Sequence, residues 1–321
     1  MDNTDTFEEL HGALKAASES VRLKVLACLG ANSFGVGELS DIFAMPQPGM
    51  SHHLRILSQA GLVESRREGN SLFYRRPIWP SDHPLHSLIT SLMEVLDVVH
   101  ITEEEKLRIE EVYSKRAQQS RNFFHKHAAT FSKSQSLIAT YDQYGSSLVS
   151  LVKNLPNGDG TTALEVGPGD SSFLQELAAR YQHVYATDNS PEMLDRARKS
   201  CQSIGIAERI NWINGDCTTI LNKGIYANII VLSMVLHHMA SPRELFMNAQ
   251  KILVKGGALL ICDLCPHQEE WARESCGDLW LGFASEDLNI WGKQAGLKPG
   301  PKLFTGLKNG FQVQLRLFFR A

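Results

Sequence analysis

From residue 161 onward, short apolar runs alternate with amphipathic helical patterns, and this alternation constrains the fold more than any other feature of the sequence. The apolar runs have the length of buried strands and are Thr161–Gly167, His183–Asp188, Arg209–Asn214, Ala227–Val235 and Gly256–Leu264. Helical patterns over Ser172–Tyr181, Pro191–Gly205 and Pro242–Leu253 lie between them. Strands separated by helices form a parallel sheet with both faces covered, so we predict an α/β fold with a doubly wound, mostly parallel, Rossmann-like sheet.

The chain ends in a different strand pattern. Pro301–Lys308 and Phe311–Arg320 flank the turn residues Asn309 and Gly310, and apolar residues alternate along the last segment. An Asn-Gly pair between two such segments is a strong signal for a hairpin. We therefore predict a terminal antiparallel hairpin at the edge of the sheet.

Glycine and acidic residues follow the predicted strands, at the edge where open α/β sheets bind ligands. Gly167 and Gly169 let the backbone approach a ligand closely. Asp188 ends the second strand and can bind both ribose hydroxyls, and Asp216 follows the third, where it can accept a hydrogen bond from an adenine amino group. The third glycine of a dinucleotide fingerprint is absent, with Ser171 in its place, which disfavours a pyridine-nucleotide dehydrogenase.

These features resemble the class I S-adenosylmethionine-dependent methyltransferases over about residues 145–321. The resemblance implies that Glu165 orients the loop, that Gly167 and Gly169 face the methionine part, and that Asp188 holds the ribose. It adds cofactor-binding residues around the adenine and at the end of the fourth strand: Asn189, Met193, Asp216, Cys217 and Ser233. The expected ligand is S-adenosylmethionine or S-adenosylhomocysteine.

A residue that catalyses methyl transfer is harder to identify. His237 and His238 follow the fourth strand and are candidate general bases, but the sequence shows no compelling catalytic constellation around them. Binding of trivalent arsenic for methylation is another possibility, and it rests on Cys262, Cys265 and Cys276. Cys262 lies within an apolar strand pattern, which favours a small core residue instead.

The first 80 residues show short helices followed by one hairpin. Three segments between residues 21 and 57 carry apolar residues at helical spacing. In the third segment Met50, Leu54 and Leu57 recur at i, i+4 and i+7 and would face a core. The polar residues that then face outward are Gln47, Ser51, His52 and Arg55.

The predicted hairpin turns at Gly69 and Asn70 and is basic. The stretch Pro48–Arg76 contains five arginines and no lysine against Glu64 and Glu68, a local balance of +3 in a chain with a net charge of −3. A helix with a polar outer face followed by a basic hairpin suits contacts with base edges and with phosphates. The sequence therefore predicts a DNA-binding module.

The stretch Gln47–Leu57, the following Ala60–Val63 and the hairpin ending at Tyr74 resemble the ArsR family of winged-helix repressors. The resemblance implies a homodimer that reads an inverted repeat in double-stranded DNA. The predicted DNA-binding residues are Gln47, Ser51, His52, His53, Arg55, Arg66, Arg67, Asn70 and Arg75. Many members of that family sense metals through a thiolate box, but Gly37–Ile42 contains no cysteine, so no metal is expected.

Residues 81–144 are predicted to be a helical dimerisation and connector region. The apolar residues between Leu85 and Val99 recur at spacings of three and four, which predicts an amphipathic helix suited to dimerisation. A second helix begins after Thr102 and could lie over the pocket of the next domain. The predicted domains are therefore residues 1–80, 81–144 and 145–321.

Composition excludes some classes of protein. The chain is 43% apolar and 21% charged, as globular proteins are, and no apolar run reaches the length of about 18 residues that a membrane span needs. Six scattered cysteines and an acidic start without a secretory pattern favour a reduced, cytoplasmic protein.

The two parts together resemble the SahR-type ArsR regulators. The resemblance implies a transcriptional repressor whose C-terminal domain binds S-adenosylhomocysteine or S-adenosylmethionine and which controls genes of the methyl or methionine cycle. The alternative is an S-adenosylmethionine-dependent methyltransferase that acts on a small molecule, with the winged helix as a dimer or regulatory module.

Overall fold

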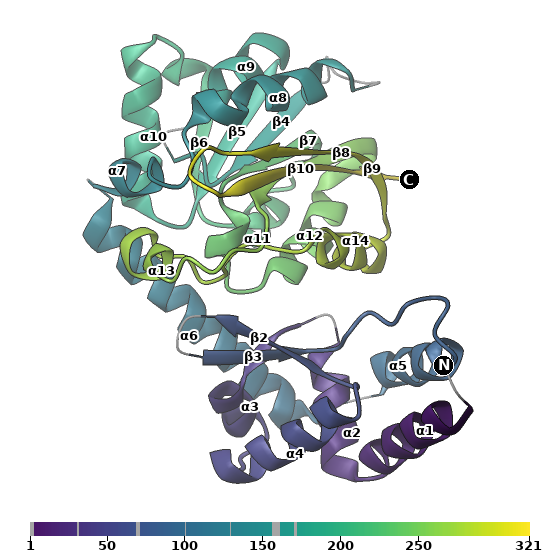
Figure 1. The fold of residues 1–321 in the computed structure, drawn as a ribbon. Coiled ribbons are helices and arrows are strands. Elements are labelled where there is room, and N and C mark those ends of the chain that lie inside the picture. The colour runs from purple at the N-terminus through teal and green to yellow at the C-terminus, as the bar shows by residue number, and fades with distance from the viewer. Residues whose placement is uncertain are drawn as a thin grey trace. The chain divides into compact units, whose positions relative to one another are not determined.

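The chain forms two compact units, Met1–Lys115 and Arg116–Ala321 (Figure 1). The computed structural model describes residues 3–30, 32–68, 71–99, 101–128, 130–155, 161–169 and 172–321. The boundary between the units falls inside the helix α6 (Glu103–His127), so both units share the predicted connector region. No helix in the described ranges is long and apolar enough to cross a membrane.

The first unit has the predicted order of helices followed by a hairpin. Its elements before α6 are α1 (Asn3–Ala17), α2 (Ser20–Leu29), β1 (Phe34–Gly35), α3 (Val36–Ile42), α4 (Gln47–Gln59), β2 (Glu64–Glu68), β3 (Ser71–Arg75) and α5 (His86–Val98). The strands β2 and β3 pair antiparallel, and β1 adds to the other edge of β3. The predicted N-terminal helix-turn-helix with its wing is therefore confirmed.

The spacing of apolar residues on α4 decides how this helix packs. Met50, Leu54 and Leu57 are fully buried and pack against a core that includes Leu26 and Leu39. Pro48 lies in the first turn of the helix, where a missing N–H breaks no helical hydrogen bond. The opposite face of α4 is therefore left to polar side chains.

The second unit is built on one mixed sheet. Its described strands are β4 (Thr162–Val166), β5 (His183–Asp188), β6 (Ile210–Asn214), β7 (Ala227–Ser233), β8 (Leu253–Leu264), β9 (Leu297–Gly306) and β10 (Gln312–Arg320). They follow the order β6-β5-β4-β7-β8-β10-β9, in which β4 to β8 run parallel and β10 is antiparallel to both of its neighbours. The predicted fold class and the terminal hairpin are confirmed.

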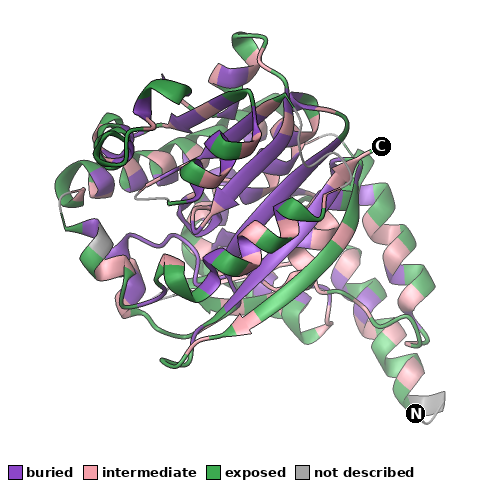
Figure 2. Cartoon of the chain, turned by 90° about the horizontal axis from the view of Figure 1, so that it is seen from above, coloured by how far each residue is buried: buried purple, intermediate pink, exposed green. Residues whose placement is uncertain are grey.

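Helices cover both faces of this sheet (Figure 1). They are α7 (Phe131–Gln135), α8 (Tyr141–Lys153), α9 (Phe173–Arg180), α10 (Pro191–Ser203), α11 (Cys217–Asn222), α12 (Pro242–Ile252), α13 (Trp271–Cys276) and α14 (Ser285–Gln294). The helices α8, α9 and α10 lie on one face and α11, α12 and α14 on the other. Figure 2 shows the result, a buried sheet between helices that are buried on one side only.

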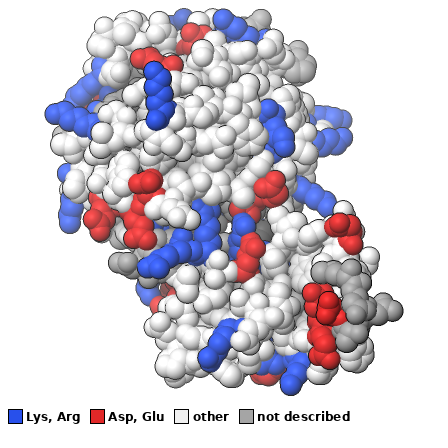
Figure 3. All heavy atoms as spheres, in the orientation of Figure 1, with Lys and Arg blue, Asp and Glu red and all other residues white. Residues whose placement is uncertain are grey.

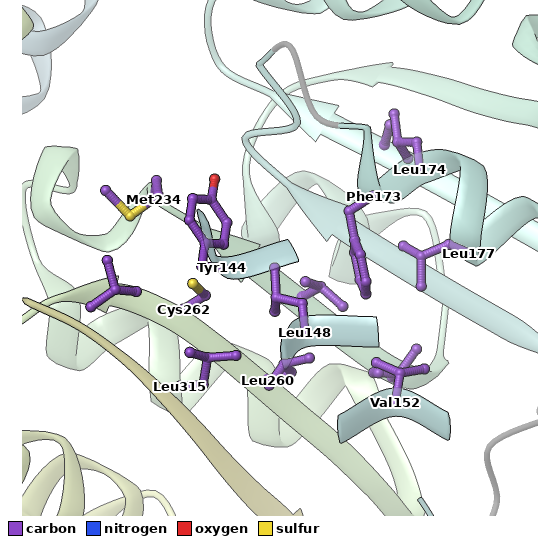
Figure 4. Close-up of a cluster of buried hydrophobic side chains, with 14 of the residues drawn as sticks. Tyr144, Leu148, Val152, Phe173, Leu174, Leu177, Met234, Leu260, Cys262 and Leu315 are labelled. Atoms are coloured by element: carbon purple, nitrogen blue, oxygen red, sulfur yellow. The ribbon is translucent and has the colours of Figure 1, made fainter. Parts of the chain in front are cut away.

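The core on the α8 side is assembled from distant parts of the sequence. Leu148 of α8, Phe173 of α9 and Leu260 of β8 are fully buried in one cluster with Cys262 and Leu315 (Figure 4). Every residue of β10 from Val313 to Phe318 is buried, whereas most of β9 is exposed, because β10 lies between β8 and β9 and β9 forms the edge. The carboxyl ends of the parallel strands are thereby fixed at one edge of a rigid layer.

Candidate functional sites

The loop after β4 depends on glycine. Gly167 has φ +65°, and its N–H donates to the carbonyl of Thr187 at 2.8 Å. A Cβ on Gly167 would stand 2.7 Å from the side chain of Val235, and one on Gly169 (φ +52°) would stand 3.9 Å from Cε of Met193. Both conformations are unfavourable for other residues. The conformation of this loop therefore favours glycine at both positions, while Ser171 lies outside the described residues.

Glu165 and Asp188 occupy the carboxyl ends of β4 and β5. Glu165 is fully buried. Asp188 is half-buried, and its Oδ1 accepts a hydrogen bond from the N–H of Ser190 at 2.8 Å. Burial raises the pKa of Asp188 to about 6, against the backbone hydrogen bonds from Ser190 and Asn189, which lower it. A carboxylate held in this way gains from a ligand that donates hydrogen bonds to it.

Asp216 follows β6 and caps α11. Its Oδ1 accepts from the N–H of Thr219 at 3.0 Å, so the residue has the structural role of a helix cap. The Asp216 side chain is exposed, as is Asn189 near the end of β5. Cys217 is buried, and burial raises the pKa of its thiol to about 12. The Gly215 N–H donates to the carbonyl of Asp188 at 2.9 Å, which joins the ends of β5 and β6.

Met193 connects this edge to the second half of α6. It is buried in a small cluster with Phe124 of α6 and Phe131 of α7. Two polar contacts hold the same segment on α10: Nδ1 of His125 lies 2.6 Å from Oε1 of Glu192, and the guanidinium of Arg196 donates to the carbonyl of Ala128. The end of α6 therefore packs directly on a residue predicted to contact the ligand.

The end of β7 contains a strained backbone. Met234 has φ +57°, a conformation that residues other than glycine rarely adopt, and its N–H donates to the carbonyl of Cys262 at 2.8 Å. Ser233 is hydrogen bonded to Tyr144 of α8; burial raises the pKa of Tyr144, and the bond to Ser233 opposes that shift. Strain of this kind often accompanies functional sites.

His237 and His238 form a buried polar cluster just after β7, in the turn Leu236–His238. Nδ1 of His237 lies 2.8 Å from Oδ1 of Asp263, and its Nε2 lies 3.8 Å from Oδ1 of Asp278. Burial alone would lower the pKa of His237, but Asp263 and Asp278 raise it to about 9.

His238 is enclosed by aromatic rings. Its ring lies edge-on to the rings of Phe124 and Phe131, with distances between ring centroids of 5.0 Å and 5.8 Å. Nδ1 is 3.2 Å from the carbonyl of Gly277, and burial, with the neighbouring His237, lowers the pKa of His238 well below its ordinary value. The pKa of one candidate general base, His237, is therefore raised, and that of the other, His238, is lowered.

The cysteines considered for arsenic are free thiols, and all three are buried. Burial raises the pKa of Cys265 to about 11 and that of Cys276 to about 12, and it raises the pKa of Cys262 well above its ordinary value. Cys262 packs in the core beside Leu315, as expected for a core residue. Among the described residues, the cluster of metal-ligand side chains is His237, His238 and Asp278, and it contains no cysteine.

In the first unit, α4 carries most of its predicted DNA-binding residues on one exposed face. Gln47, Ser51, His52 and Arg55 are all exposed, and a guanidinium nitrogen of Arg55 lies 3.3 Å from Nδ1 of His52. His53 does not share this face. Its side chain is only 18% exposed, and its Nδ1 lies 3.6 Å from a carboxylate oxygen of Glu19, at the start of α2.

The arginines of the hairpin have several different surroundings. Arg67 is exposed and Arg66 half-buried on β2. Arg75 donates from Nε to Glu64 across the strands at 2.5 Å. Arg76 lies inside the unit, where it donates to the carbonyl of Leu26 at 2.7 Å and to Asp97 at 2.6 Å. Asn70 lies outside the described residues.

Charges of both signs lie on the face of the molecule that Figure 3 shows. On the face shown in Figure 3, lysine and arginine side chains are interspersed with aspartate and glutamate. No broad basic field covers this face, in keeping with the net charge of −3. A DNA-binding surface would therefore rest on a few arginines of α4 and the hairpin.

The apolar stripe of α5 is divided between core and surface. Leu85, just before the helix, and Ile89 and Leu96 within it are buried in the core of the first unit. Val95 and Val98 are 60% and 75% exposed. This helix therefore presents an apolar face that the described part of its own unit leaves uncovered.

Two family matches cover separate parts of the chain. Residues 17–66 match a family described as a helix-turn-helix domain, and residues 164–261 match one described as a methyltransferase domain. The first match contains α4, and the second contains the ends of β4 to β7.

Relatives and solved structures agree with this division. An HTH-type transcriptional regulator of Methanocaldococcus jannaschii is 39% identical over 71 residues, which are 22% of this chain and 80% of that protein. The transcriptional repressor SdpR of Bacillus subtilis is 32% identical over 65 residues, 20% of this chain and 72% of SdpR. One chain of the complex between the methyltransferase activator Trm112 of Haloferax volcanii and a methyltransferase aligns with a TM-score of 0.50 at 13% identity, over 62% of this chain and 97% of that chain. This last likeness concerns the fold alone.

The structure brings the predicted ligand residues to one edge of the sheet and adds residues that the sequence analysis does not identify. Asp263 and Asp278 join His237, and Phe124 and Phe131 join Met193. Asp263 could have been suspected from its place near the end of a predicted strand. Asp278 has no comparable signal, because it lies in an irregular segment about 40 residues from the histidines in sequence.

Proposed function

Because this chain belongs to the ArsR-type helix-turn-helix transcriptional regulators and carries a methyltransferase domain, we propose that it is a repressor whose methyltransferase domain binds S-adenosylhomocysteine or S-adenosylmethionine as its effector. One observation carries the proposal. The chain that exposes a polar face on α4 also places glycines and aspartates at the carboxyl ends of β4, β5 and β6, where such a fold binds its ligand.

The DNA contacts are proposed to come from α4 and the hairpin. Gln47, Ser51, His52 and Arg55 would face base edges and phosphates in the major groove, and Arg66 and Arg67 would contact phosphates from the wing. His53 and Arg75 already contact Glu19 and Glu64, so they would contribute through positioning. The name of the relative SdpR supports repression as the direction of control.

The partner in DNA binding is proposed to be a second copy of the chain. An apolar face of α5 that includes Val95 and Val98 is exposed in the single chain. A twofold dimer through this helix would present two α4 helices to the two halves of an inverted repeat. Exchanging Val95 and Val98 for aspartate should give a monomer with weakened DNA affinity, measured by sedimentation and by a DNA mobility shift.

The effector is proposed to bind along the strand ends of the second unit. The Asp188 carboxylate would accept hydrogen bonds from the ribose hydroxyls, and the adenine would lie near Asn189, Met193, Asp216 and Cys217. The methionine part would follow the Gly167–Gly169 loop toward Ser233. Glu165, near the end of β4, would orient that loop.

The helix α6 is proposed to transmit the binding event. Val112, in its first half, is buried in the core of the first unit, and Phe124, in its second half, packs on Met193 in the second unit. A ligand that prefers one position of Met193 and Phe124 would bias one position of the same helix. Ligand and DNA would then alter one another's affinity by equal factors.

The genes under control are proposed to encode enzymes of the methyl or methionine cycle. The protein itself is proposed to be cytoplasmic. Such a repressor would match their expression to the level of the adenosyl ligand that it binds. A small-molecule methyltransferase is the second candidate, favoured by the buried pair formed by His237, just after β7, and Asp263 of β8.

A calorimetric titration of the full chain tests the proposal. The protein is titrated with S-adenosylhomocysteine and with S-adenosylmethionine, each with and without DNA from its own promoter. We expect one ligand to bind more tightly than the other and the DNA to change that affinity by the factor by which the ligand changes DNA affinity. Absence of binding by either ligand, or binding without any effect of DNA, would overturn the regulator in favour of an uncoupled domain.

A matched pair of variants makes this test specific. Asp188→Ala removes the proposed ribose contact, whereas Asp195→Asn changes an exposed carboxylate on α10 that pairs with Lys199. Only the first should abolish the response of DNA binding to ligand. Release of S-adenosylhomocysteine from S-adenosylmethionine in the presence of candidate small molecules would instead support the methyltransferase.

A further inference from the structure

The cluster at the end of β7 has the composition and spacing of a metal site. His237 and His238 come from the turn Leu236–His238, and Asp278 comes from the segment after α13. One possible ligand atom from each residue lies within 4.8 Å of the others, and all three residues are buried. We propose that these three side chains bind a divalent transition-metal ion of the zinc class, through residues other than those of the proposed nucleotide site.

The distances suit such an ion. Oδ1 of Asp278 is 3.8 Å from Nε2 of His237 and 3.7 Å from Nδ1 of His238. Ligands of a tetrahedral ion with bonds near 2.0–2.1 Å are separated by about 3.3 Å. The two distances to Asp278 are each within about 0.5 Å of that separation. Two imidazoles and one carboxylate favour zinc, cobalt or iron over magnesium or calcium, which prefer oxygen ligands.

The surroundings hold the first histidine in the orientation that a metal ligand needs. Nδ1 of His237 faces Oδ1 of Asp263 at 2.8 Å, which leaves Nε2 directed at Asp278. The Asp263 carboxylate is itself fixed by the N–H groups of Leu236 and Leu264, each at 2.8 Å. A carboxylate behind a histidine is the usual outer contact of a histidine that binds a metal.

The two segments of the site are also joined through the backbone. The carbonyl of His237 accepts from the N–H of Leu279 at 3.0 Å and from that of Trp280 at 3.1 Å. These residues directly follow Asp278, so the turn that carries the histidines fixes the segment that carries the carboxylate. The three ligands are therefore placed by the fold before any ion binds.

The second histidine is buried, with its Nδ1 facing Asp278. His238 is only 8% exposed, and its Nε2 is buried without a hydrogen-bond partner. Phe124 and Phe131 enclose the ring, so water has little access to it. A buried imidazole in such surroundings loses hydration, and a bound cation would offset that loss. Binding through Nδ1 would place the ring proton on Nε2 and replace the hydrogen bond from Nδ1 to the carbonyl of Gly277.

The test uses the full chain without a histidine tag. The protein is stripped of metal and titrated with Co²⁺, and the visible absorption of the ion reports nitrogen and oxygen ligands. We expect one Co²⁺ for each chain, displaced by Zn²⁺. Asp278→Asn and His238→Gln should each weaken Co²⁺ binding by more than about 100-fold, while Asp263→Asn, which changes only the outer contact, should weaken it by about 10- to 100-fold.

The control variant is His183→Gln, which removes an exposed imidazole on β5 and should bind Co²⁺ as the parent does. Each variant is also titrated with S-adenosylhomocysteine, whose binding shows that the unit is folded and does not depend on the metal ligands. No Co²⁺ bound by the parent, or equal binding by Asp278→Asn, would overturn the metal site. Neither result would affect the nucleotide titration, so the two proposals fail separately.

Discussion

The two candidate sites of this protein are built in opposite ways. On α4, the polar residues Gln47, Ser51 and Arg55 come from a single helix and are exposed. At the edge of the sheet, Gly167, Asp188 and their neighbours come from separate strands, and several of them are buried. A surface that must reach a large, charged partner can be presented by one helix, whereas a pocket for a small ligand must gather groups from several elements. The consequences of substitution should therefore differ between the two.

The largest expected effect is at Asp188. Replacing Asp188 with asparagine should weaken binding of S-adenosylhomocysteine by about 100-fold, because the two proposed hydrogen bonds to a charged acceptor are lost. The same variant should raise the melting temperature of the unliganded protein. The folded state raises the pKa of Asp188 to about 6, so the ionised carboxylate is less favourable there than in the unfolded chain at neutral pH. Calorimetry and thermal melting measure the two effects, and a lower melting temperature would contradict the assignment.

The next prediction compares two arginines of the first unit, one internal and one exposed. Arg76→Ala should lower the free energy of unfolding by about 2–3 kcal/mol, because its hydrogen bonds to Leu26 and Asp97 are inside the first unit. Arg55→Ala, on the exposed face of α4, should leave unfolding unchanged and weaken binding to promoter DNA by about tenfold. Denaturant titration and a DNA mobility shift distinguish the two. Equal loss of stability in both variants would show that α4 has no separate binding face.

The pH dependence should be a property of the buried site alone. Protonation of Asp188 competes with ribose binding, so affinity for S-adenosylhomocysteine should be constant above the pKa of about 6 and fall below it. We expect a loss of about tenfold between about pH 7.5 and about pH 5. The nearby carboxylate of Glu192 on α10 contributes to the raised pKa. Asp188→Asn should bind weakly at every pH, and the same slope in that variant would assign the titration to another group.

The smallest effect compares two glycines with similar backbone angles. Gly205→Ala (φ +73°) places its Cβ in open space and should cost about 1 kcal/mol of stability from the backbone conformation. Gly167→Ala (φ +65°) adds a clash with Val235 and should cost about 1 kcal/mol more, with loss of ligand binding. Thermal melting and ligand titration of both variants measure this difference. Equal stability of the two would show that the loop after β4 can relax.

Local patterns were sufficient to predict the strands and most of the helices that carry these residues. The spacing of Met50, Leu54 and Leu57 predicts the buried face of α4, and the end of each apolar run predicts where Asp188 and Asp216 lie. The helix α8 is not anticipated, although Thr140 and Gln143 form a capping box at its start. The role of Asp216 as a helix cap also appears only in the structure.

The sequence alone was enough to predict the class of each unit and the edge of the sheet at which the proposed ligand residues lie, because periodicity along a segment records which side faces a core. Other features required the folded structure. Arg76 is internal while Arg67 is exposed, His53 contacts Glu19, and Phe124 packs on Met193. The proximity of His237 and His238 to Asp278 is likewise seen only in the folded structure. Such contacts join residues far apart in the chain, and their existence depends on the path of the backbone between them, which no local pattern encodes.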